Sequence, residues 1–260
     1  MSTTQQAVVL TVAGSDSGGG AGIQADLKTF RALEVFGTCA ITCITAQNPH
    51  RVSAIQSVTP AMVTAQIERV FEAFPVRAVK TGMLDNAGTI GAVAAAIRRH
   101  RLRRVVVDPV MIASSGARLL RRDAVAALTE LLPQALLVTP NLTEAEGLLG
   151  QRVESLDEMR EAARALAAQY GAAFLVKGGH RRGDRRVVDV LCDGRDLYEF
   201  SAARLTGIKT HGTGCVLSAA ITANLALGAG LVESVARAKQ FVTRAIRGAV
   251  GIGRFHALNV

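Results

Sequence analysis

The 260-residue sequence contains no tryptophan, and aromatic residues make up only 4% of it. Hydrophobic residues nevertheless make up 49%, so the core has to be built from the aliphatic side chains of alanine, valine, leucine and isoleucine. Charged residues make up 20%, and together with the hydrophobic content this excludes an intrinsically disordered chain. The composition therefore indicates a globular protein with one sizeable core.

Cysteine is scarce, with four residues at positions 39, 43, 192 and 215. They form no C-x-x-C pair, so neither a disulfide scaffold nor a cysteine zinc site is indicated. The five histidines are scattered and form no H-E-x-x-H motif. We expect Cys39, Cys43 and Cys192, which lie in apolar strand-like segments, to be small buried residues.

Long hydrophobic runs are also lacking. The longest one, from Val216 to Ala229, is interrupted by Asn224 and is too short to span a bilayer. The first six residues are polar and uncharged, unlike the basic start of a secretory signal. We therefore expect a cytoplasmic protein that does not associate with a membrane.

Acidic residues are outnumbered, with 21 Asp and Glu against 30 Lys and Arg, which gives a net charge of +9. This balance favours anionic partners such as nucleotides, nucleic acid or acidic lipid. Aromatic residues are not interleaved with the arginines as they are on base-stacking surfaces, so we expect no nucleic-acid partner. A basic nucleic-acid-binding protein on a catalytically idle fold is the alternative of a different functional class.

Short β-rich segments alternate with longer segments of helical periodicity. The predicted strands are 8–13, 38–45, 78–81, 105–108, 136–139, 174–177, 187–192 and 197–201, and the predicted helices are 20–33, 59–74, 86–100, 123–132, 155–170, 213–227 and 232–246. This alternation predicts a mostly parallel sheet with helices on both faces, in a single domain over residues 1–260. A (β/α)₈ barrel is the rival architecture, but the late hairpin around Asp193 and the terminal helix pair favour an open sheet.

Ligands of open α/β sheets bind beyond the carboxyl ends of the strands. The unusual segments of this sequence follow predicted strands, at 14–22, 47–49, 80–83, 108–109, 139–144 and 177–180. In segment 14–22 the glycines let the backbone approach a ligand closely. This segment does not match the dinucleotide fingerprint G-x-G-x-x-G, which would need glycine in place of Ile23, and the sequence contains no Walker A motif.

The segment His211-Gly212-Thr213-Gly214-Cys215 precedes a long apolar helix. Its small residues leave the first backbone N–H groups of the helix open, and the helix dipole adds partial positive charge. The segment therefore suits a transferring phosphoryl group. We expect the Cys215 thiol at this helix start to have a lowered pKa, the alternative being that Cys215 is simply a small buried residue.

Three further polar sites each admit two interpretations. Asn141 and Glu144 form a helix-capping pair, or Glu144 orients the water shell of Mg²⁺. Lys177 ends a predicted strand beside two glycines, where it either reaches nucleotide phosphates or is an exposed surface lysine. Asp26 lies one turn into the first predicted helix, where it either hydrogen-bonds a polar heterocycle or lies on a solvated face.

Seven strings follow one another over essentially the whole chain: GSDSGGGAGIQADLKTF, AITCITAQNP, AVKTGML, VVVDPVM, TPNLTEAEGLLG, VKGGH and HGTGCVLSAAI. In this order and spacing they closely resemble the hydroxymethylpyrimidine/phosphomethylpyrimidine kinases of thiamine biosynthesis, which belong to the ribokinase-like superfamily. The resemblance implies a three-layer ribokinase-like α/β fold and a homodimer. It also implies a kinase that uses Mg-ATP to convert 4-amino-5-hydroxymethyl-2-methylpyrimidine to its monophosphate and then to its diphosphate.

The same resemblance implies roles for individual residues. The residues that would hold the pyrimidine are Gly14, Asp26, Gln47 and Met83. The residues that would organise Mg-ATP are Asp108, Asn141 and Glu144, with Asp108 and Glu144 holding the metal. Lys177 would meet the phosphates and Lys239 would lie near the nucleotide. The anion hole that receives the phosphoryl group would consist of Gly212, Thr213, Gly214 and Cys215.

Two positions depart from the wider pattern. Many ribokinase-like enzymes have an aspartate as general base at the end of the G-T-G motif, whereas this sequence has Cys215, as the pyrimidine branch often does. Gln47 stands where some relatives have glutamate, but its amide both donates and accepts and still suits an aminopyrimidine. The nearest alternative is pyridoxal kinase, which shares the fold, the chemistry and a similar substrate shape.

Overall fold

The structure, a computed structural model, describes residues 6–111, 119–120, 124–179, 185–208 and 211–260. Its main strands are β1 (Val8–Asp16), β2 (Phe36–Asn48), β3 (Arg51–Ser57), β4 (Val76–Thr81), β5 (Val105–Val107), β6 (Leu137–Val138), β7 (Ala173–Val176), β8 (Arg186–Cys192) and β9 (Leu197–Ala203). They form a nine-stranded sheet in the order β3-β2-β1-β4-β5-β6-β7-β8-β9.

The middle of this sheet is parallel and its edges are antiparallel. The pairs from β2 through β1, β4, β5 and β6 to β7 run parallel, whereas β3, β8 and β9 pair antiparallel. Strands β5, β6 and β7 are buried along their whole length, which explains their unbroken apolar sequences. The predicted open sheet is confirmed, and the barrel alternative is wrong because β3 and β9 are free edges.

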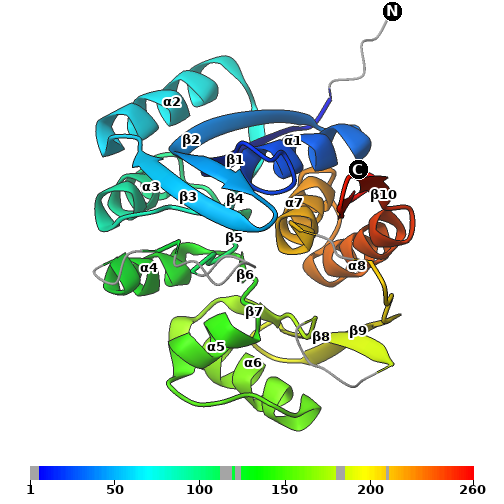
Figure 1. Ribbon diagram of the computed structural model, residues 1–260. Helices are drawn as coiled ribbons and strands as arrows, with labels where there is room; N and C mark the ends of the chain where they lie inside the picture. Colours follow the sequence, from blue (N-terminus) through cyan, green and yellow to red (C-terminus); the bar gives the residue numbers. More distant parts are fainter. Residues whose placement is uncertain (1–5, 112–118, 121–123, 180–184, 209–210) are drawn as a thin grey trace, which may run out of the picture.

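Helices cover both faces of the sheet (Figure 1). They are α1 (Gly22–Ala32), α2 (Pro60–Ala73), α3 (Ala87–Arg99), α4 (Val125–Leu131), the 3₁₀ turn η2 (Leu132–Gln134), α5 (Leu142–Leu149), α6 (Leu156–Tyr170), α7 (Thr213–Ala226) and α8 (Leu231–Arg247). One hydrophobic cluster joins α2, α3, α4, α5 and α6 to the sheet, and a second joins α1, α7 and α8 to its other face. Within the described ranges, no helix has the length and apolar character needed to cross a membrane.

Several helices begin at caps that the sequence contains. The Thr59 side chain accepts a hydrogen bond from the first turn of α2, and Asn86 does the same for α3. Asn141 and Ser155 begin full capping boxes at α5 and α6. By contrast, α1 and α7 begin without a side-chain cap, so the N–H groups of their first turns are not taken up by a capping side chain.

The sequence did not predict three strands. These are β3 and the small antiparallel pair β10 (Val250–Ile252) and β11 (Phe255–Ala257). Most residues of β3 and all of β10 are exposed, so neither strand has an apolar pattern. The chain therefore does not end with two helices as predicted. Position 123, the predicted start of α4, lies outside the described residues. Of the three cysteines that were expected to be buried, Cys43 and Cys192 are buried and Cys39 is only partly buried.

The polar segments that follow the parallel strands lie side by side at the carboxyl ends of these strands. Backbone hydrogen bonds continue the strand pairing into these segments: the N–H of Asp108 donates to Thr81, and that of Lys177 donates to Pro140, at 3.1 and 2.9 Å. Asn141 and Lys177 also form an isolated parallel bridge. The sheet therefore sets the position of the residues from which the site is built.

Candidate active site

One cavity of about 500 Å³ lies at the carboxyl ends of the parallel strands. Its walls are the glycine-rich turn after β1, the end of β2, the segments after β4, β5, β6 and β7, and the turn before α7. The predicted site residues that line it are Gly14, Gln47, Met83, Asp108, Asn141, Glu144, Lys177, Gly212, Thr213, Gly214, Cys215 and Lys239. Asp26 is the one predicted site residue that does not line it.

The turn after β1 and the turn before α7 are in direct contact. Gly212 has a φ of +82°, and a Cβ added to it would lie 1.8 Å from the carbonyl oxygen of Gly20. Gly22 has a φ of +57°, and its Cβ would lie 2.4 Å from the carbonyl oxygen of Gly14. Only glycine tolerates both the positive φ and this close approach. These glycines therefore bring the two turns into contact with each other in the wall of the cavity.

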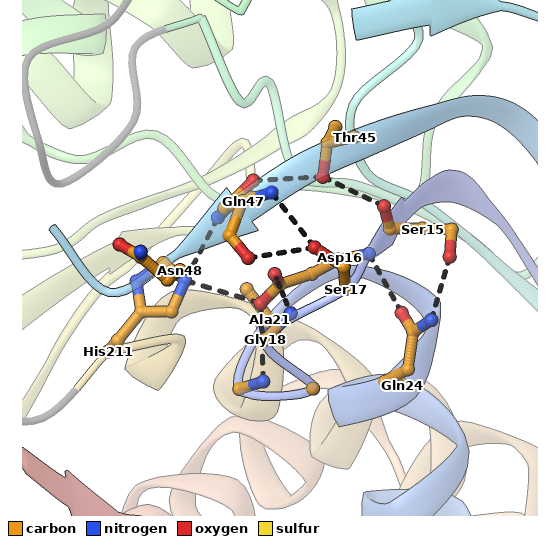
Figure 2. Close-up of polar contacts among 12 residues, drawn as sticks. Ser15, Asp16, Ser17, Gly18, Ala21, Gln24, Thr45, Gln47, Asn48 and His211 are labelled. Atoms are coloured by element: carbon orange, nitrogen blue, oxygen red, sulfur yellow. Dashed lines mark hydrogen bonds and ion pairs between the residues drawn. The ribbon is translucent and has the colours of Figure 1, made fainter. Parts of the chain in front are cut away.

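The glycine turn folds around the carboxylate of Asp16 (Figure 2). The backbone N–H of Gly18 donates to Oδ1 at 2.8 Å, and those of Gly20 and Ala21 donate to Oδ2 at 3.2 and 2.9 Å. Burial raises the pKa of Asp16, but the hydrogen bonds from His211, Gly18 and Ala21 bring it below its ordinary value. Because this internal carboxylate occupies the amides, the turn suits an uncharged ligand better than a phosphate.

Gln47 lies at the end of β2 and connects three parts of the site. Its backbone N–H donates to Ser17 Oγ, which donates in turn to the Gln47 carbonyl oxygen, both at 2.8 Å. Its side-chain Oε1 lies 3.2 Å from Thr45 Oγ1, and Nε2 lies 3.1 Å from His211 Nε2 (Figure 2). His211 Nε2 also lies 3.5 Å from Asp16 Oδ2. The Gln47 amide is thus held between the sheet and the turn before α7.

Asp26 forms a buried ion pair. Its two oxygens lie 2.7 Å from Lys80 Nζ, neither side chain is exposed, and Thr11 Oγ1 donates to it at 2.6 Å. Burial alone would lower the pKa of Lys80, but Asp26 raises it above its ordinary value, so the lysine is charged. Lys80 lines the cavity and Asp26 does not, so Asp26 reaches a ligand only through Lys80. The solvated-face interpretation of Asp26 is wrong.

Asp108 and Lys177 form a second ion pair, 3.0 Å long, inside the cavity. Ser218 Oγ donates to the other oxygen of Asp108 at 3.1 Å. Burial raises the pKa of Asp108, but Lys177, Lys80 and Ser218 hold it below its ordinary value. The Lys177 side chain is only 13% exposed, so its interpretation as a surface lysine is wrong.

Glu144 fulfils the capping interpretation and also lines the cavity. Its Oε2 accepts from the Asn141 backbone N–H at 2.9 Å, and Asn141 Oδ1 accepts from the Glu144 N–H at 3.0 Å. Its Oε1 accepts from the Met111 N–H at 3.1 Å. Burial raises the pKa of Glu144 above its ordinary value, although Lys177 opposes this. Among the described residues, no group of three or more His, Cys, Asp or Glu side chains is arranged to hold a metal ion.

Cys215 lines the cavity at the start of α7, but the expected lowering of its pKa is wrong. Burial raises the pKa of the thiol to about 11. The charge of Lys80 and the N–H of Gly22 act in the opposite direction but do not compensate for the loss of water. The thiol is therefore protonated at neutral pH.

Lys239 lies at the far end of the cavity, on α8. Its Nζ donates to Asp189 Oδ2 at 2.6 Å, and Asp189 Oδ1 accepts from the Gly178 N–H at 2.9 Å. The lining there is otherwise largely apolar and includes Val242 and Ile246 of α8. His180, which belongs to the same glycine-rich string as Gly178, lies outside the described residues.

The sequence did not indicate roles for Lys80, Asp189 and His211. The signal for the first two is a charged residue inside an otherwise apolar strand, in AVKT and VVDVLC. Such residues are rarely buried without a partner, so each one predicts a buried ion pair but does not identify the partner. His211 directly precedes the glycine turn of α7, but its contacts lie far away in the sequence.

Comparisons with known proteins identify the family of this chain. The family described as Phosphomethylpyrimidine kinase matches residues 16–259. The chain is 52% identical over 250 residues to the thiamine biosynthesis bifunctional protein ThiED of Geobacter sulfurreducens, which covers 95% of this chain but only 51% of that protein. The chain thus spans about half the length of that relative. It is 50% identical over 254 residues to the hydroxymethylpyrimidine/phosphomethylpyrimidine kinase of Rhizobium meliloti, with 95% of each covered.

A solved structure with the same fold is an ADP complex of Bacillus subtilis pyridoxal kinase. It superposes with a TM-score of 0.88 at 36% identity and covers 98% of this chain and 97% of that one. The predicted ribokinase-like α/β fold is confirmed. By its sequence and its fold, the chain belongs to the phosphomethylpyrimidine kinase family.

Proposed function

We propose that this chain transfers the γ-phosphoryl group of ATP to the hydroxymethyl group of 4-amino-5-hydroxymethyl-2-methylpyrimidine, and then phosphorylates the monophosphate to the diphosphate for thiamine biosynthesis. The names of the relatives support this substrate. The structural observation that carries the proposal is the direct contact between the turn after β1 and the turn before α7, which line one cavity. A phosphoryl acceptor at the first turn therefore lies beside a phosphoryl site at the second.

The pyrimidine is placed at the end formed by Gly14, Gln47 and Met83. There the amides of the glycine turn are occupied by Asp16, so the ligand is recognised through the Gln47 amide and through apolar contact. A Cβ on Gly14 would lie 2.7 Å from Cys43 Sγ, which explains why no side chain occupies that wall. Asp26 acts as a positioning residue through Lys80 rather than as a direct contact.

The phosphates of ATP are placed at the start of α7. The N–H groups of this first turn have no side-chain cap, and the helix dipole adds partial positive charge. A Cβ on Gly214 would lie 3.4 Å from Lys177 Nζ and 4.0 Å from Asp108 Oδ2, so the missing side chain leaves room for a phosphate beside both groups. The nucleoside extends toward Lys239 and the apolar wall of α8.

Magnesium fits the two carboxylates at this end. Asp108 and Glu144 both line the cavity, and the nearby charge of Asp108 contributes to the raised pKa of Glu144. Mg²⁺ binds through one or two carboxylates together with substrate phosphates and water, so this pair is sufficient. When bound, it would neutralise charge on the phosphates.

Positioning and charge stabilisation do most of the chemical work in this proposal. Transfer through a loose transition state needs little help from a base, and the Cys215 thiol is protonated at neutral pH. Lys177 and the backbone amides of the Gly212–Cys215 turn stabilise charge on the transferred group, and each such donor typically contributes about 3 kcal/mol. The substrate hydroxyl is aimed in line by the contacts at the glycine turn.

The test is a time course of purified protein with Mg-ATP and the pyrimidine alcohol, in which monophosphate and diphosphate are resolved. We expect the monophosphate first and the diphosphate after it. Lys177→Met protein prepared in the same way serves as the control and should form both products about 10²–10³ times more slowly than the wild type. The absence of both products with the wild type would refute the proposal, and monophosphate alone would refute the second step.

Pyridoxal is the second candidate substrate, because the superposed Bacillus subtilis structure is named as a pyridoxal kinase. The two candidates are separated by kcat/KM for pyridoxal and for the pyrimidine alcohol under the same conditions. The proposal expects the higher value for the pyrimidine. A higher value for pyridoxal would replace the substrate but not the reaction.

We also propose that the enzyme is a cytoplasmic homodimer with no nucleic-acid partner. The edge formed by β2 and β3 exposes Phe36, Ile44 and Ile55, and a second copy of the chain would cover them. Sedimentation equilibrium at micromolar concentration should therefore give twice the chain mass. A monomer would contradict the dimer, and steeply salt-dependent RNA binding would contradict the choice of partners.

A further inference from the structure

The hydrogen bonds around Gln47 determine more than its position (Figure 2). A half-turn of the side-chain amide exchanges its oxygen and its nitrogen at nearly the same two places. In the structure, Oε1 occupies the place that faces the Thr45 hydroxyl and Nε2 the place that faces the His211 ring, whereas the contacts of these neighbours favour the exchanged orientation. Which atom occupies which place decides the order of donor and acceptor that Gln47 presents to a ligand.

The first evidence comes from the Thr45 hydroxyl. Its Oγ1 lies 2.9 Å from the Ser15 carbonyl oxygen and 3.2 Å from the nearer atom of the Gln47 amide. A hydroxyl has only one proton to donate, and the shorter contact with the carbonyl takes it. The second contact is then favourable only if Gln47 presents its NH₂ group to Thr45.

The second evidence comes from Asp16. Its carboxylate accepts from the turn amides and lies 3.5 Å from His211 Nε2. An ionised carboxylate can only accept, so the ring nitrogen that faces it carries a proton. A proton on Nε2 in turn needs an acceptor on Gln47 at 3.1 Å, and only the amide oxygen provides one.

The third evidence is the other nitrogen of the same ring. Nδ1 of His211 is buried, and no described residue forms a hydrogen bond with it. A proton there would be a buried, unpaired donor, which typically costs about 1–3 kcal/mol. A lone pair without a partner is tolerated better than an orphaned N–H. The proton therefore belongs on Nε2.

We infer that His211, held by Asp16, is a specificity-determining residue: it turns the Gln47 amide oxygen toward itself and so fixes the order of acceptor and donor that the heterocycle meets. The acceptor then lies on the His211 side and the donor on the Thr45 side. This inference rests on the proposed function, in which Gln47 reads the pyrimidine.

The fixed order also orients the substrate. A 4-aminopyrimidine presents an amino donor beside a ring-nitrogen acceptor, so its amino group meets the Gln47 oxygen on the His211 side. The 5-hydroxymethyl group is on the neighbouring ring carbon, and His211 continues directly into the Gly212–Cys215 turn. The order therefore directs the hydroxymethyl group toward the phosphoryl site. A 4-oxo analogue presents an acceptor beside a ring N–H, which is the reverse order.

The test compares kcat/KM for the 4-amino alcohol with kcat/KM for its 4-oxo analogue. We expect the wild type to favour the amino compound by about 10² or more, because two mismatched contacts in the reverse order cost about 1–3 kcal/mol each. His211→Leu leaves the amide free to turn, and the ratio should fall by about tenfold or more. An unchanged ratio in a folded His211→Leu protein would overturn the inference.

Three further variants separate specificity from a structural role. His211→Gln returns a side-chain N–H to the same region and should recover much of the ratio. In a Gln47→Ala background, His211→Leu should leave the ratio unchanged, because there is no amide left to orient. His100→Leu, at the end of α3, is the matched control and should keep the wild-type ratio. Equal losses for both substrates, in both backgrounds, would show a structural role and refute the inference.

Thr45→Val provides an independent test if His211→Leu does not fold. It keeps the shape of the side chain but removes the hydroxyl that receives the NH₂ group, so the ratio should fall in this variant too. Calorimetric measurement of the affinity for each of the two pyrimidines separates a failure of the inference from a failure of the proposed function. Selective binding of the amino compound without its phosphorylation would refute the proposed function only, and equal binding of both compounds would refute the inference.

Discussion

The two ends of the cavity offer a ligand different kinds of contact. At the proposed pyrimidine end, the carboxylate of Asp16 is occupied by backbone amides and by His211, and the side chain left to meet a ligand is the neutral amide of Gln47. At the proposed nucleotide end, the ion pairs Lys177–Asp108 and Lys239–Asp189 place full charges in the wall. A neutral amide distinguishes ligands by their order of donors and acceptors, whereas charges attract and stabilise phosphate. The net charge of +9 would therefore favour the binding of ATP but does not account for the choice of a pyrimidine.

The pair Asp26–Lys80 is fully buried, so breaking it should have the largest effect. Asp26→Ala leaves the Lys80 ammonium buried without its partner, and breaking a buried pair typically costs about 3–5 kcal/mol. We expect the urea midpoint of unfolding to fall accordingly. Asp157→Ala, at an exposed ion pair with Arg160, is the control and should cost less than about 1 kcal/mol. Equal stability of the two variants would contradict the account.

Lys177→Met should damage the nucleotide end alone. Removing this charge from a water-excluded site should lower kcat by about 10²–10³, which is typical for one preorganised donor. The affinity for the pyrimidine alcohol, measured by calorimetry, should stay within about twofold because Gln47 and the glycine turn are intact. If kcat is preserved and only pyrimidine binding weakens, the two ends have been assigned the wrong way round.

The pKa of Cys215 gives a pH-dependent prediction. Because burial raises the pKa to about 11, the thiolate fraction rises only as the pH approaches that value. At pH 8, alkylation of Cys215 by iodoacetamide should be about 10² slower than that of an ordinary thiol with a pKa near 8.5. Peptide mapping with Cys215→Ser protein as the reference assigns the site. Rapid alkylation at pH 7 would show that the helix dipole outweighs burial after all.

Gln47→Ala should produce the smallest of these changes and should be confined to the pyrimidine end. We expect the KM for the pyrimidine alcohol to rise about tenfold, which corresponds to the loss of one or two neutral hydrogen bonds. The KM for ATP should change by less than about twofold. Thr64→Ala on the exposed side of α2 is the matched control. An increase in the KM for ATP alone would place Gln47 at the wrong end.

Local patterns revealed the elements and the glycine turns, but not the partners that complete the site. The parallel strands and the caps Thr59 and Ser155 depend on neighbouring residues, so the sequence shows them directly. Lys80 pairs with Asp26 across 54 positions, and His211 meets Gln47 across 164. Such partners are set by the order of strands in the sheet, which no local pattern contains.

The wrong prediction for Cys215 has the same origin. Its position at a helix start is visible in the sequence and favours the thiolate. The desolvation that outweighs this effect comes from the packing around α7, which only the fold shows. Similarly, β3 escaped prediction because most of its residues are exposed, which leaves no alternation to recognise.

The central claim is that the pyrimidine and the nucleotide occupy opposite ends of one cavity at the same time. Calorimetric titration of the pyrimidine alcohol into protein saturated with Mg²⁺ and a non-hydrolysable ATP analogue tests this directly. We predict one equivalent of pyrimidine bound, with an affinity equal to or tighter than that of the nucleotide-free protein. Loss of pyrimidine binding in the presence of the analogue would show that the two ligands compete for one place, and it would contradict the account.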